Sequence, residues 1–237
     1  MSIDDQKRTC GEAAAALVER GMTVGLGTGS TAAYFVRALG ERARAEALDL
    51  RCVATSKATA ALAAEVGLLV IELDEAGAID LTVDGADEVG PQLALIKGGG
   101  AALLREKLVW EASRRCVVIA DAAKRVDPLG AFALPVEVVA FGHATTAGRI
   151  ARVLESLGYD AAPKLRMAGG APLVTDNGGV IYDLPLGVIQ APAPLATALK
   201  ATTGVVEHGL FLGLAAEALI GTDAGVERLA PATGGAH

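Results

Sequence analysis

MTVGLGTGST, residues 22–31, places a short apolar run directly before a turn rich in glycine and hydroxyl residues. The apolar run predicts a buried strand, and the alanine-rich segment that follows, with Phe35, Val36 and Leu39, predicts a helix. A strand, a tight turn and a helix in this order form the repeating unit of an α/β fold.

The same alternation continues through the first half of the chain. The further elements that we expect are strands at 50–54, 68–73, 79–83 and 116–120 and helices at 10–20, 58–66 and 100–112. Such alternation predicts a mostly parallel sheet that is covered by helices on both faces.

The pattern changes after Gly130. The elements expected there are a strand at 134–139, a helix at 146–157, a hairpin-like turn at 176–179 and a helix near 195–200. The order strand, helix, strand, strand, helix, strand is typical of a ferredoxin-like α+β module. Residues 204–211 are predicted to resume the strands of the first domain, which makes this module an insertion. We therefore expect a main domain of residues 1–130 and 207–237 and an inserted α+β domain of residues 131–206.

Composition limits the classes of protein that this chain can represent. Of its 237 residues 52% are hydrophobic but only 3% are aromatic, so the core must consist of Ala, Val, Leu and Ile. No apolar run approaches the roughly 20 residues of a membrane span, and residues 1–9 are polar and charged, unlike a signal sequence. These features predict a cytoplasmic protein that does not enter a membrane.

Cysteine usage and charge exclude further classes of site. Cys10, Cys52 and Cys116 are odd in number and far apart, so neither a disulfide framework nor a zinc site is indicated. The net charge is −7 and no block of basic residues occurs, which argues against a nucleic-acid surface or a polybasic membrane patch. An anionic ligand must therefore be held by local features.

The first such feature is the turn that contains Thr28, Ser30 and Thr31, at the start of the predicted helix. Free backbone N–H groups at a helix start favour an anion, and glycines allow it to approach closely, so the turn suits a phosphate. A tight turn with a hydroxyl helix cap would look the same. A dinucleotide fingerprint would need glycine in place of Ser30, and a P-loop would need a Gly-Lys-Ser/Thr ending that is missing.

The second feature is the acidic segment Asp84-Gly85-Ala86-Asp87-Glu88, which follows the predicted strand 79–83. Open α/β sheets bind ligands at the carboxyl ends of their strands. The segment could also be a solvated turn, or its carboxylates could bind Mg²⁺. The three histidines, His143, His208 and His237, are dispersed without the spacing of metal ligands.

The third feature is IKGGGAALLREK, residues 96–107, in which Lys97 precedes three glycines that are expected to open a helix. A lysine beside free backbone N–H groups suits an oxyanion or a phosphate. Within this helix Glu106 has only apolar neighbours at helical spacing, which predicts a poorly hydrated carboxylate with a raised pKa. Arg105 has equally apolar neighbours, so a salt bridge of Arg105 or Glu106 at the rim of a site is the competing interpretation.

The fourth feature is Lys124, which follows the predicted strand 116–120 together with Arg125. A Lys-Arg pair alone is usually solvated. Four strand ends with complementary chemistry nevertheless point to one shared site.

These motifs, taken in order, resemble the ribose-5-phosphate isomerase type A family. The segments that carry the resemblance are 25–31, 84–88, 97–107 and 120–130, followed by 134–138, 175–178 and 204–211. DGADE followed at this separation by KGGGAALLREK is far more specific than a lone glycine turn. The resemblance covers nearly the whole chain.

The resemblance implies a Rossmann-like main domain with an inserted α+β domain, a homodimer or dimer of dimers, and no metal or other cofactor. It also implies the aldose–ketose step of the pentose phosphate pathway, in which ribose 5-phosphate and ribulose 5-phosphate interconvert through an enediolate. The positions that match the family's substrate-binding residues are Thr28, Gly29, Ser30, Thr31, Asp84, Gly85, Ala86, Asp87, Lys97, Gly98, Gly99, Gly100 and Lys124. Lys7 is a further candidate near the substrate, whereas residues 55–59 and the tail after Gly221 add no site assignments.

The resemblance also implies catalytic roles. Glu106 is expected to carry the proton between C2 and C1, and Lys97 with the N–H groups of Gly98 to Gly100 to stabilise the oxyanion. Asp84 or Asp87 would relay protons between the oxygens, with Asp84 the first candidate for ring opening. Two other functions stay open: a non-catalytic sugar-phosphate sensor, which would have no use for Glu106, and a CoA-transferase-like enzyme, which would bind CoA.

Overall fold

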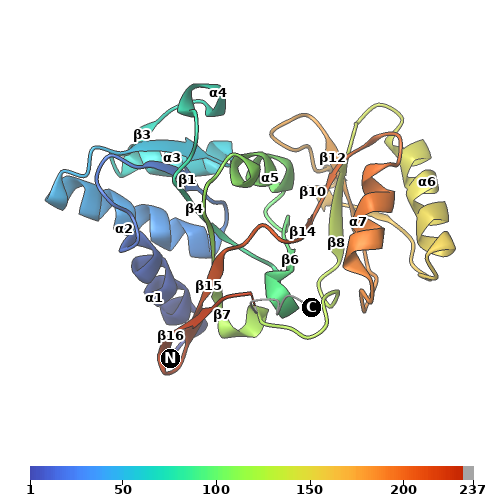
Figure 1. Cartoon of the computed structure of the whole chain (residues 1–237). Coiled ribbons are helices and arrows are strands. Elements are labelled where there is room, and N and C mark those ends of the chain that lie inside the picture. Colours follow the sequence, from blue (N-terminus) through green and yellow to red (C-terminus); the bar gives the residue numbers. More distant parts are fainter. Residues whose placement is uncertain (232–237) are drawn as a thin grey trace.

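A seven-stranded sheet forms the main domain, in the left half of Figure 1. The structure is a computed structural model that describes residues 1–231, so the last part of the predicted segment 207–237 and His237 lie outside the described residues. The strand order is β16-β15-β7-β4-β1-β2-β3, and only β15 and β16 pair antiparallel. The strands are β1 (Thr23–Leu26), β2 (Arg51–Ala54), β3 (Leu69–Val70), β4 (Leu81–Gly85), β7 (Cys116–Asp121), β15 (Glu217–Thr222) and β16 (Gly225–Leu229). The predicted mostly parallel sheet is confirmed.

Helices cover both faces of this sheet. α1 (Ile3–Ala15) and α2 (Ser30–Glu46) contact β4, β7 and β15 on one face, and α5 (Leu103–Glu111) lies on the other. Along β7, Val117 and Ile119 belong to the core under α1 and α2, whereas Val118 packs with Trp110 of α5. Side chains alternate along a strand, so this apolar strand supplies both cores. The shorter helices α3 (Lys57–Glu65) and α4 (Leu73–Ala76) lie in the connections that follow β2 and β3.

The inserted domain, in the right half of Figure 1, has the predicted ferredoxin-like topology. Its elements are β8 (Leu134–Val138), α6 (His143–Ser156), β9 (Lys164–Leu165), β12 (Val180–Leu184), α7 (Pro192–Lys200) and β13 (Val205–His208), with a short hairpin of β10 (Met167–Ala168) and β11 (Ala171–Pro172). The antiparallel sheet has the order β13-β8-β12-β9, which is fourth, first, third, second in chain order. A separate apolar core holds this sheet against α6 and α7.

The expectation that residues 204–211 resume the strands of the first domain was wrong for residues 205–208, whereas Leu210 and Phe211 pair with a strand of residues 1–130. β13 pairs with β8 of the inserted domain, and β14 (Leu210–Phe211) pairs with β6 (Leu95–Ile96) in a small sheet that also contains β5 (Glu88–Val89). The chain re-enters the main sheet only at β15. Strands as short as VVEH and LF have no feature that distinguishes one sheet from another, and the partner strand changes at Gly209. The predicted domain boundary at 206/207 falls within β13 and stays a prediction.

Three other element predictions need correction. The first helix is Ile3–Ala15 rather than 10–20, because Ser2 caps its N-terminus in a capping box with Asp5. The expected strand 68–73 is cut to Leu69–Val70, since Leu73 begins a helix. The expected helix 100–112 starts at Leu103, because Gly98 and Ala101 have left-handed φ values of 116° and 60° that a helix cannot contain.

β1 lies at the point where the sheet order reverses. The chain leaves β1 toward β2 and β3 on one side and returns to β4 on the other side. Ligands bind at such a switch point, outside the carboxyl ends of the strands. The turn after β1 and the acidic segment after β4 therefore share one edge of the sheet.

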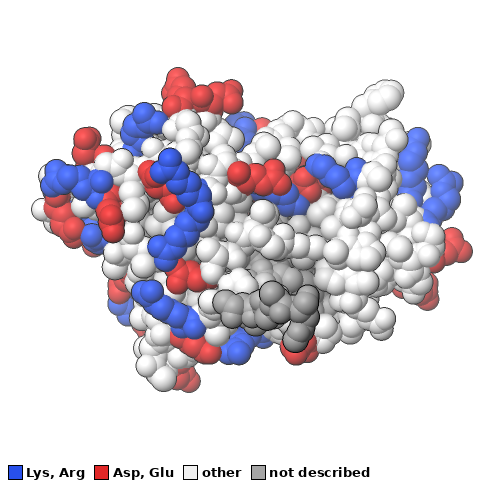
Figure 2. Space-filling view, in the orientation of Figure 1, with Lys and Arg blue, Asp and Glu red and all other residues white. Residues whose placement is uncertain are grey.

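The surface in Figure 2 carries acidic and basic side chains side by side over the main domain, and no broad basic area covers this face. Within residues 1–231, no helix combines the length and the apolar character needed to cross a bilayer. All three cysteines are buried free thiols.

Candidate active site

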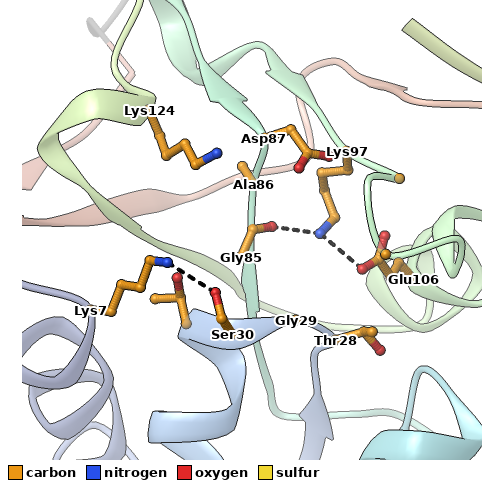
Figure 3. Close-up of a pocket in the computed structure, with 13 residues that line it drawn as sticks. Lys7, Thr28, Gly29, Ser30, Gly85, Ala86, Asp87, Lys97, Glu106 and Lys124 are labelled. Atoms are coloured by element: carbon orange, nitrogen blue, oxygen red, sulfur yellow. Dashed lines mark hydrogen bonds and ion pairs between the residues drawn. The ribbon is translucent and has the colours of Figure 1, made fainter. Parts of the chain in front are cut away.

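A pocket opens at this switch point, between the main domain and the loop that leads into α5 (Figure 3). Its volume is about 120 Å³. The residues that line it are Lys7, Thr28, Gly29, Ser30, Thr31, Gly85, Ala86, Asp87, Lys97, Gly98, Gly100, Glu106 and Lys124. The structure thus brings together all four sequence features. Asp84 and Gly99 do not line it: Asp84 is buried beside Gly85, and Gly99 is an exposed residue between Gly98 and Gly100.

The ammonium of Lys97 lies at the centre of the buried side of the pocket. Its Nζ is 3.0 Å from Oδ2 of Asp84 and 3.3 Å from Oε1 of Glu106, and it donates a 2.5 Å hydrogen bond to the carbonyl of Gly85. Lys97 is only 2% exposed. Burial disfavours the charge, but the two carboxylates outweigh it and raise the pKa of Lys97, so the side chain stays an ammonium.

Two aromatic rings form the wall behind this ammonium. Lys97 Nζ is 5.6 Å from the centre of the Trp110 ring and 5.4 Å from that of Phe211, and the two rings meet edge to face. The ring faces stabilise a cation and keep water out. The charged cluster therefore has a dry, apolar wall on one side and the pocket on the other.

Asp84 is completely buried and is fixed by its surroundings. Its Oδ1 accepts hydrogen bonds from the backbone N–H groups of Thr28 and Gly85, at 3.0 and 2.7 Å, while Oδ2 faces Lys97. Gly27 packs so closely against it that an added Cβ would lie 2.2 Å from Oδ1. Asp84 therefore ties the turn after β1 to the end of β4 and positions Lys97.

Glu106 enters the pocket from the first turn of α5 and is 4% exposed. Burial, followed by the nearby charge of Asp84, raises the pKa of Glu106 to about 8, with Lys97 acting in the opposite direction. One oxygen, Oε2, has no hydrogen-bond partner in the described structure. The predicted poorly hydrated carboxylate is confirmed, and its ion-pair partner is Lys97, whereas Arg105 bonds to Asn177.

The glycine loop between β6 and α5 forms another wall of the pocket. The N–H of Gly99 donates a 2.7 Å hydrogen bond to Oδ2 of Asp87, which is half-buried and lines the pocket. The left-handed φ of Gly98 lets the loop turn sharply before the helix. Its peptide groups are thereby brought against the pocket.

Cations and a helix start gather at the other end of the pocket. Lys7 of α1 donates a 3.1 Å hydrogen bond to the hydroxyl of Ser30, the first residue of α2, and Lys124 extends toward the same space in Figure 3. No side chain caps the N-terminus of α2. Its free N–H groups and the two ammonium groups are suited to an anion.

Thr28 differs from its neighbours because its hydroxyl is used inside the protein. Its Oγ1 lies 2.7, 2.9 and 3.1 Å from the hydroxyl oxygens of Thr55, Ser56 and Thr59. Thr55 and Thr59 in turn donate to the carbonyls of Leu26 and Gly27. The cluster holds the turn in place from behind.

Sequence reasoning made no assignment for this hydroxyl cluster. Thr55 and Ser56 directly follow β2, the strand beside β1, so the strand-end rule would have pointed to them. Glu88, by contrast, faces away from the pocket and accepts hydrogen bonds from the backbone of Gly130 and Phe132. It joins the two predicted domains, and both of its carboxylate oxygens are engaged by backbone N–H groups.

The model of the family described as ribose 5-phosphate isomerase A (phosphoriboisomerase A) matches residues 51–225. The chain belongs to the ribose 5-phosphate isomerase A family. A curated member from Caulobacter sp. strain K31, named ribose-5-phosphate isomerase A, is 64% identical over 98% of this chain and 100% of its own length.

Solved isomerase structures share the whole fold. The ribose 5-phosphate isomerase from Plasmodium falciparum is 35% identical with a TM-score of 0.91 and covers 96% of this chain and 98% of its own. Another, described as D-ribose-5-phosphate isomerase in complex with phospho-erythronic acid, is 35% identical with a TM-score of 0.90 and covers 97% of this chain and 100% of its own. These relatives support neither the sensor nor the CoA-transferase alternative.

Within the described residues of this family member, no group of three or more His, Cys, Asp and Glu side chains is arranged to hold a metal ion. Asp84 and Asp87 point to different partners, Lys97 and the loop N–H of Gly99. The carboxylates of the pocket are thus engaged with cations and donors that belong to the protein.

Proposed function

We propose that this chain interconverts D-ribose 5-phosphate and D-ribulose 5-phosphate through an enediolate. The observation that carries the proposal is a buried carboxylate, Glu106, that lies in one pocket with an ammonium, Lys97, and with the anion site of Lys7, Ser30 and Lys124. A sugar phosphate has both an anionic end and an acidic C–H beside a carbonyl. The related isomerase with bound phospho-erythronic acid supports a site for a phosphorylated sugar acid.

Glu106 would carry the proton. Its ionised form takes the hydrogen from C2 of the open-chain aldose, the C–H electron pair forms the C1=C2 bond, and the carbonyl electrons move to O1. Return of the proton to C1, together with transfer of the O2 proton to O1, restores a carbonyl at C2 and gives the ketose. A pKa of about 8 suits both steps, because the carboxylate is basic enough to accept the proton and acidic enough to release it.

The negative charge that develops on O1 and O2 needs positive partners. Lys97 remains an ammonium and lies 3.3 Å from Glu106, so a substrate oxygen beside Glu106 is also beside this charge. The N–H groups of the glycine loop add neutral donors. The ammonium and the N–H groups are in place before the reaction, so they lower the free energy needed to form the oxyanion.

Asp87 is the better placed acid for ring opening. It lines the pocket, whereas Asp84 is 0% exposed and is held by Lys97 and two backbone N–H groups. In this proposal Asp87 exchanges protons with the sugar hydroxyls and Asp84 keeps Lys97 charged and aligned. Asp84 remains the alternative acid, and Asn substitutions at the two positions, assayed with mixtures of ring and open-chain substrate, separate their roles.

The direct test is formation of ketose from ribose 5-phosphate by the purified chain. We expect turnover without added cofactor and an unchanged rate after dialysis against EDTA. A large loss that Mg²⁺ or Mn²⁺ restores would favour a metal-assisted hydride shift instead. No turnover, with retained binding of ribose 5-phosphate, would favour a sensor, and a ligand-induced shift with CoA would favour a CoA-transferase.

The family resemblance also supports a homodimer or a dimer of dimers in the cytoplasm, without nucleic-acid or membrane partners. Light scattering of the purified chain measures its oligomeric state. Cell fractionation tests the predicted cytoplasmic location.

A further inference from the structure

The glycine loop of the active site is held from behind by a residue of the inserted domain. Arg166, between β9 and β10, donates from Nη1 to the carbonyl of Gly98 at 2.7 Å and to the carbonyl of Gly99 at 3.2 Å. Its other nitrogens form a two-pronged ion pair with Asp183 of β12, with Nε 2.9 Å from Oδ2 and Nη2 2.5 Å from Oδ1. Arg166 itself does not line the pocket.

Peptide geometry converts these two contacts into a direction for the loop N–H groups. In a trans peptide the C=O of one residue and the N–H of the next point in opposite directions. With the Gly98 carbonyl turned toward Arg166, the Gly99 N–H must point to the other side, where it meets Asp87 at 2.7 Å. With the Gly99 carbonyl turned the same way, the Gly100 N–H also points away from Arg166.

The Gly100 N–H finds no acceptor within residues 1–231, and Gly100 lines the pocket beside Lys97 and Glu106. A free donor at this place is suited to an oxygen that becomes negative during proton transfer. The positive guanidinium on the carbonyl side polarises the same peptides and makes their N–H ends better donors.

We propose that Arg166, fixed by Asp183, is a positioning residue that aims the Gly100 N–H at the developing oxyanion, so that the inserted domain completes the active site. This inference rests on the proposed isomerase function. It gives the insertion a chemical role in addition to the packing of its own apolar core.

The backbone around Arg166 does not depend on the guanidinium. Its N–H donates to Ile181 and its carbonyl accepts from Leu173, so the strands stay paired when the side chain is changed. Arg166→Met keeps the length of the stem and removes the charge. Arg166→Lys keeps the charge but cannot hold Asp183 in two bonds and reach both carbonyls. Arg152→Met is the matched control, an exposed arginine of α6 in the same domain.

The experiment measures kcat, KM and melting temperature, together with inhibition by phospho-erythronic acid and by inorganic phosphate. For Arg166→Met we expect kcat to fall about 10²-fold, the size of effect that a misplaced catalytic group produces. The affinity for phospho-erythronic acid should fall as well, whereas inhibition by phosphate, which needs only the Lys7 and Lys124 end, should stay within twofold. Arg166→Lys should recover part of kcat, and Arg152→Met should match the wild type.

A kcat of Arg166→Met within threefold of wild type would overturn the inference. So would an equal loss of phosphate affinity with a lowered melting temperature, which indicates a general structural defect. A wild-type chain that fails to convert ribose 5-phosphate would instead overturn the proposed function, and the inference with it.

Discussion

Glu106 and Lys107 are consecutive residues of α5, yet their side chains end in two separate buried clusters. Neighbours in a helix are rotated by about 100°, so Glu106 faces Lys97 in the pocket while Lys107 faces Glu207 of β13 at 2.7 Å. The helix is thus anchored to the inserted domain by one residue and delivers the base with the next. A change that breaks the contact between Lys107 and Glu207 should therefore also shift Glu106 relative to Lys97.

Replacement of the base is the most direct test of the mechanism. Glu106→Gln keeps the size of the side chain but removes its ability to accept a proton, so kcat should fall by about 10²–10⁴-fold. Binding of ribose 5-phosphate, measured by calorimetry, should largely persist because the anion site is untouched. A variant that turns over within a few-fold of wild type would contradict the assignment and move attention to Asp87.

The pH profile tests the raised pKa of Glu106. The ionised carboxylate is the base, so kcat/KM should rise with pH through about 8 and then level off. The charge of Asp84 contributes to the raised pKa, so Asp84→Asn should move this limb to lower pH. An acid limb near the ordinary carboxyl value of 4.5 in the wild type would show that Glu106 is not the titrating base.

The same shift has a consequence for stability. Between the ordinary value of 4.5 and about 8, folded Glu106 holds a proton that the unfolded chain has lost, so the free energy of unfolding falls as pH rises. Glu106→Gln removes this contribution. Its melting temperature relative to wild type should therefore be higher at pH 9 than at pH 5. A difference that does not change with pH would contradict the burial effect.

Much of the site follows from the sequence because its parts obey a local rule. Each predicted motif begins where a buried strand ends, and parallel strands put those ends at one edge. Lys97 follows β6, which lies outside the main sheet, so the strand-end rule does not apply to it. Its place in the site was predicted because the three glycines after it suit an anion. The apolar neighbours of Glu106 at helical spacing likewise predicted its burial.

The parts that were not predictable depend on contacts between distant segments. Arg166 is an unremarkable arginine in sequence, and only the placement of the inserted domain brings it to Gly98. The partner strand of residues 205–208 cannot be read from the sequence either, since a four-residue strand such as VVEH fits either sheet. A strand's burial can be predicted from its residues, but its neighbour is decided by the packing of whole domains.

The anion site predicts a strong preference for phosphorylated sugars. Lys7→Ala or Lys124→Ala should raise KM for ribose 5-phosphate about 10- to 100-fold, the usual weight of one hydrogen bond to a charged group. Unphosphorylated ribose should be a very poor substrate for the wild type, because remote phosphate binding positions the reacting carbons. Comparable kcat/KM for the two sugars would contradict the phosphate assignment. Lys57→Ala, a lysine at the start of α3 that does not line this pocket, is the control.

The cluster behind α5 predicts sensitivity to acid. Burial and the nearby Lys107 lower the pKa of His208 to about 4, so the unfolded chain binds a proton between pH 6.5 and 4 that the folded chain refuses. Burial opposes ionisation of Glu207, but hydrogen bonds from Lys107 and Lys200 prevail and lower its pKa to about 2. Both groups have depressed pKa values, so their contributions to stability are lost as the pH falls, first that of His208 and then that of Glu207.

Two variants separate these contributions in urea unfolding. His208→Asn should lose less stability than wild type between pH 6.5 and 4, because it has no proton to bind. Glu207→Gln should cost about 3–5 kcal/mol at pH 7, since it leaves the ammonium of Lys107 buried without its carboxylate. Replacing both members, Lys107→Met with Glu207→Leu, removes the unpaired charge and should recover most of that loss. If the double variant is as unstable as Glu207→Gln, the loss does not come from the unpaired ammonium of Lys107.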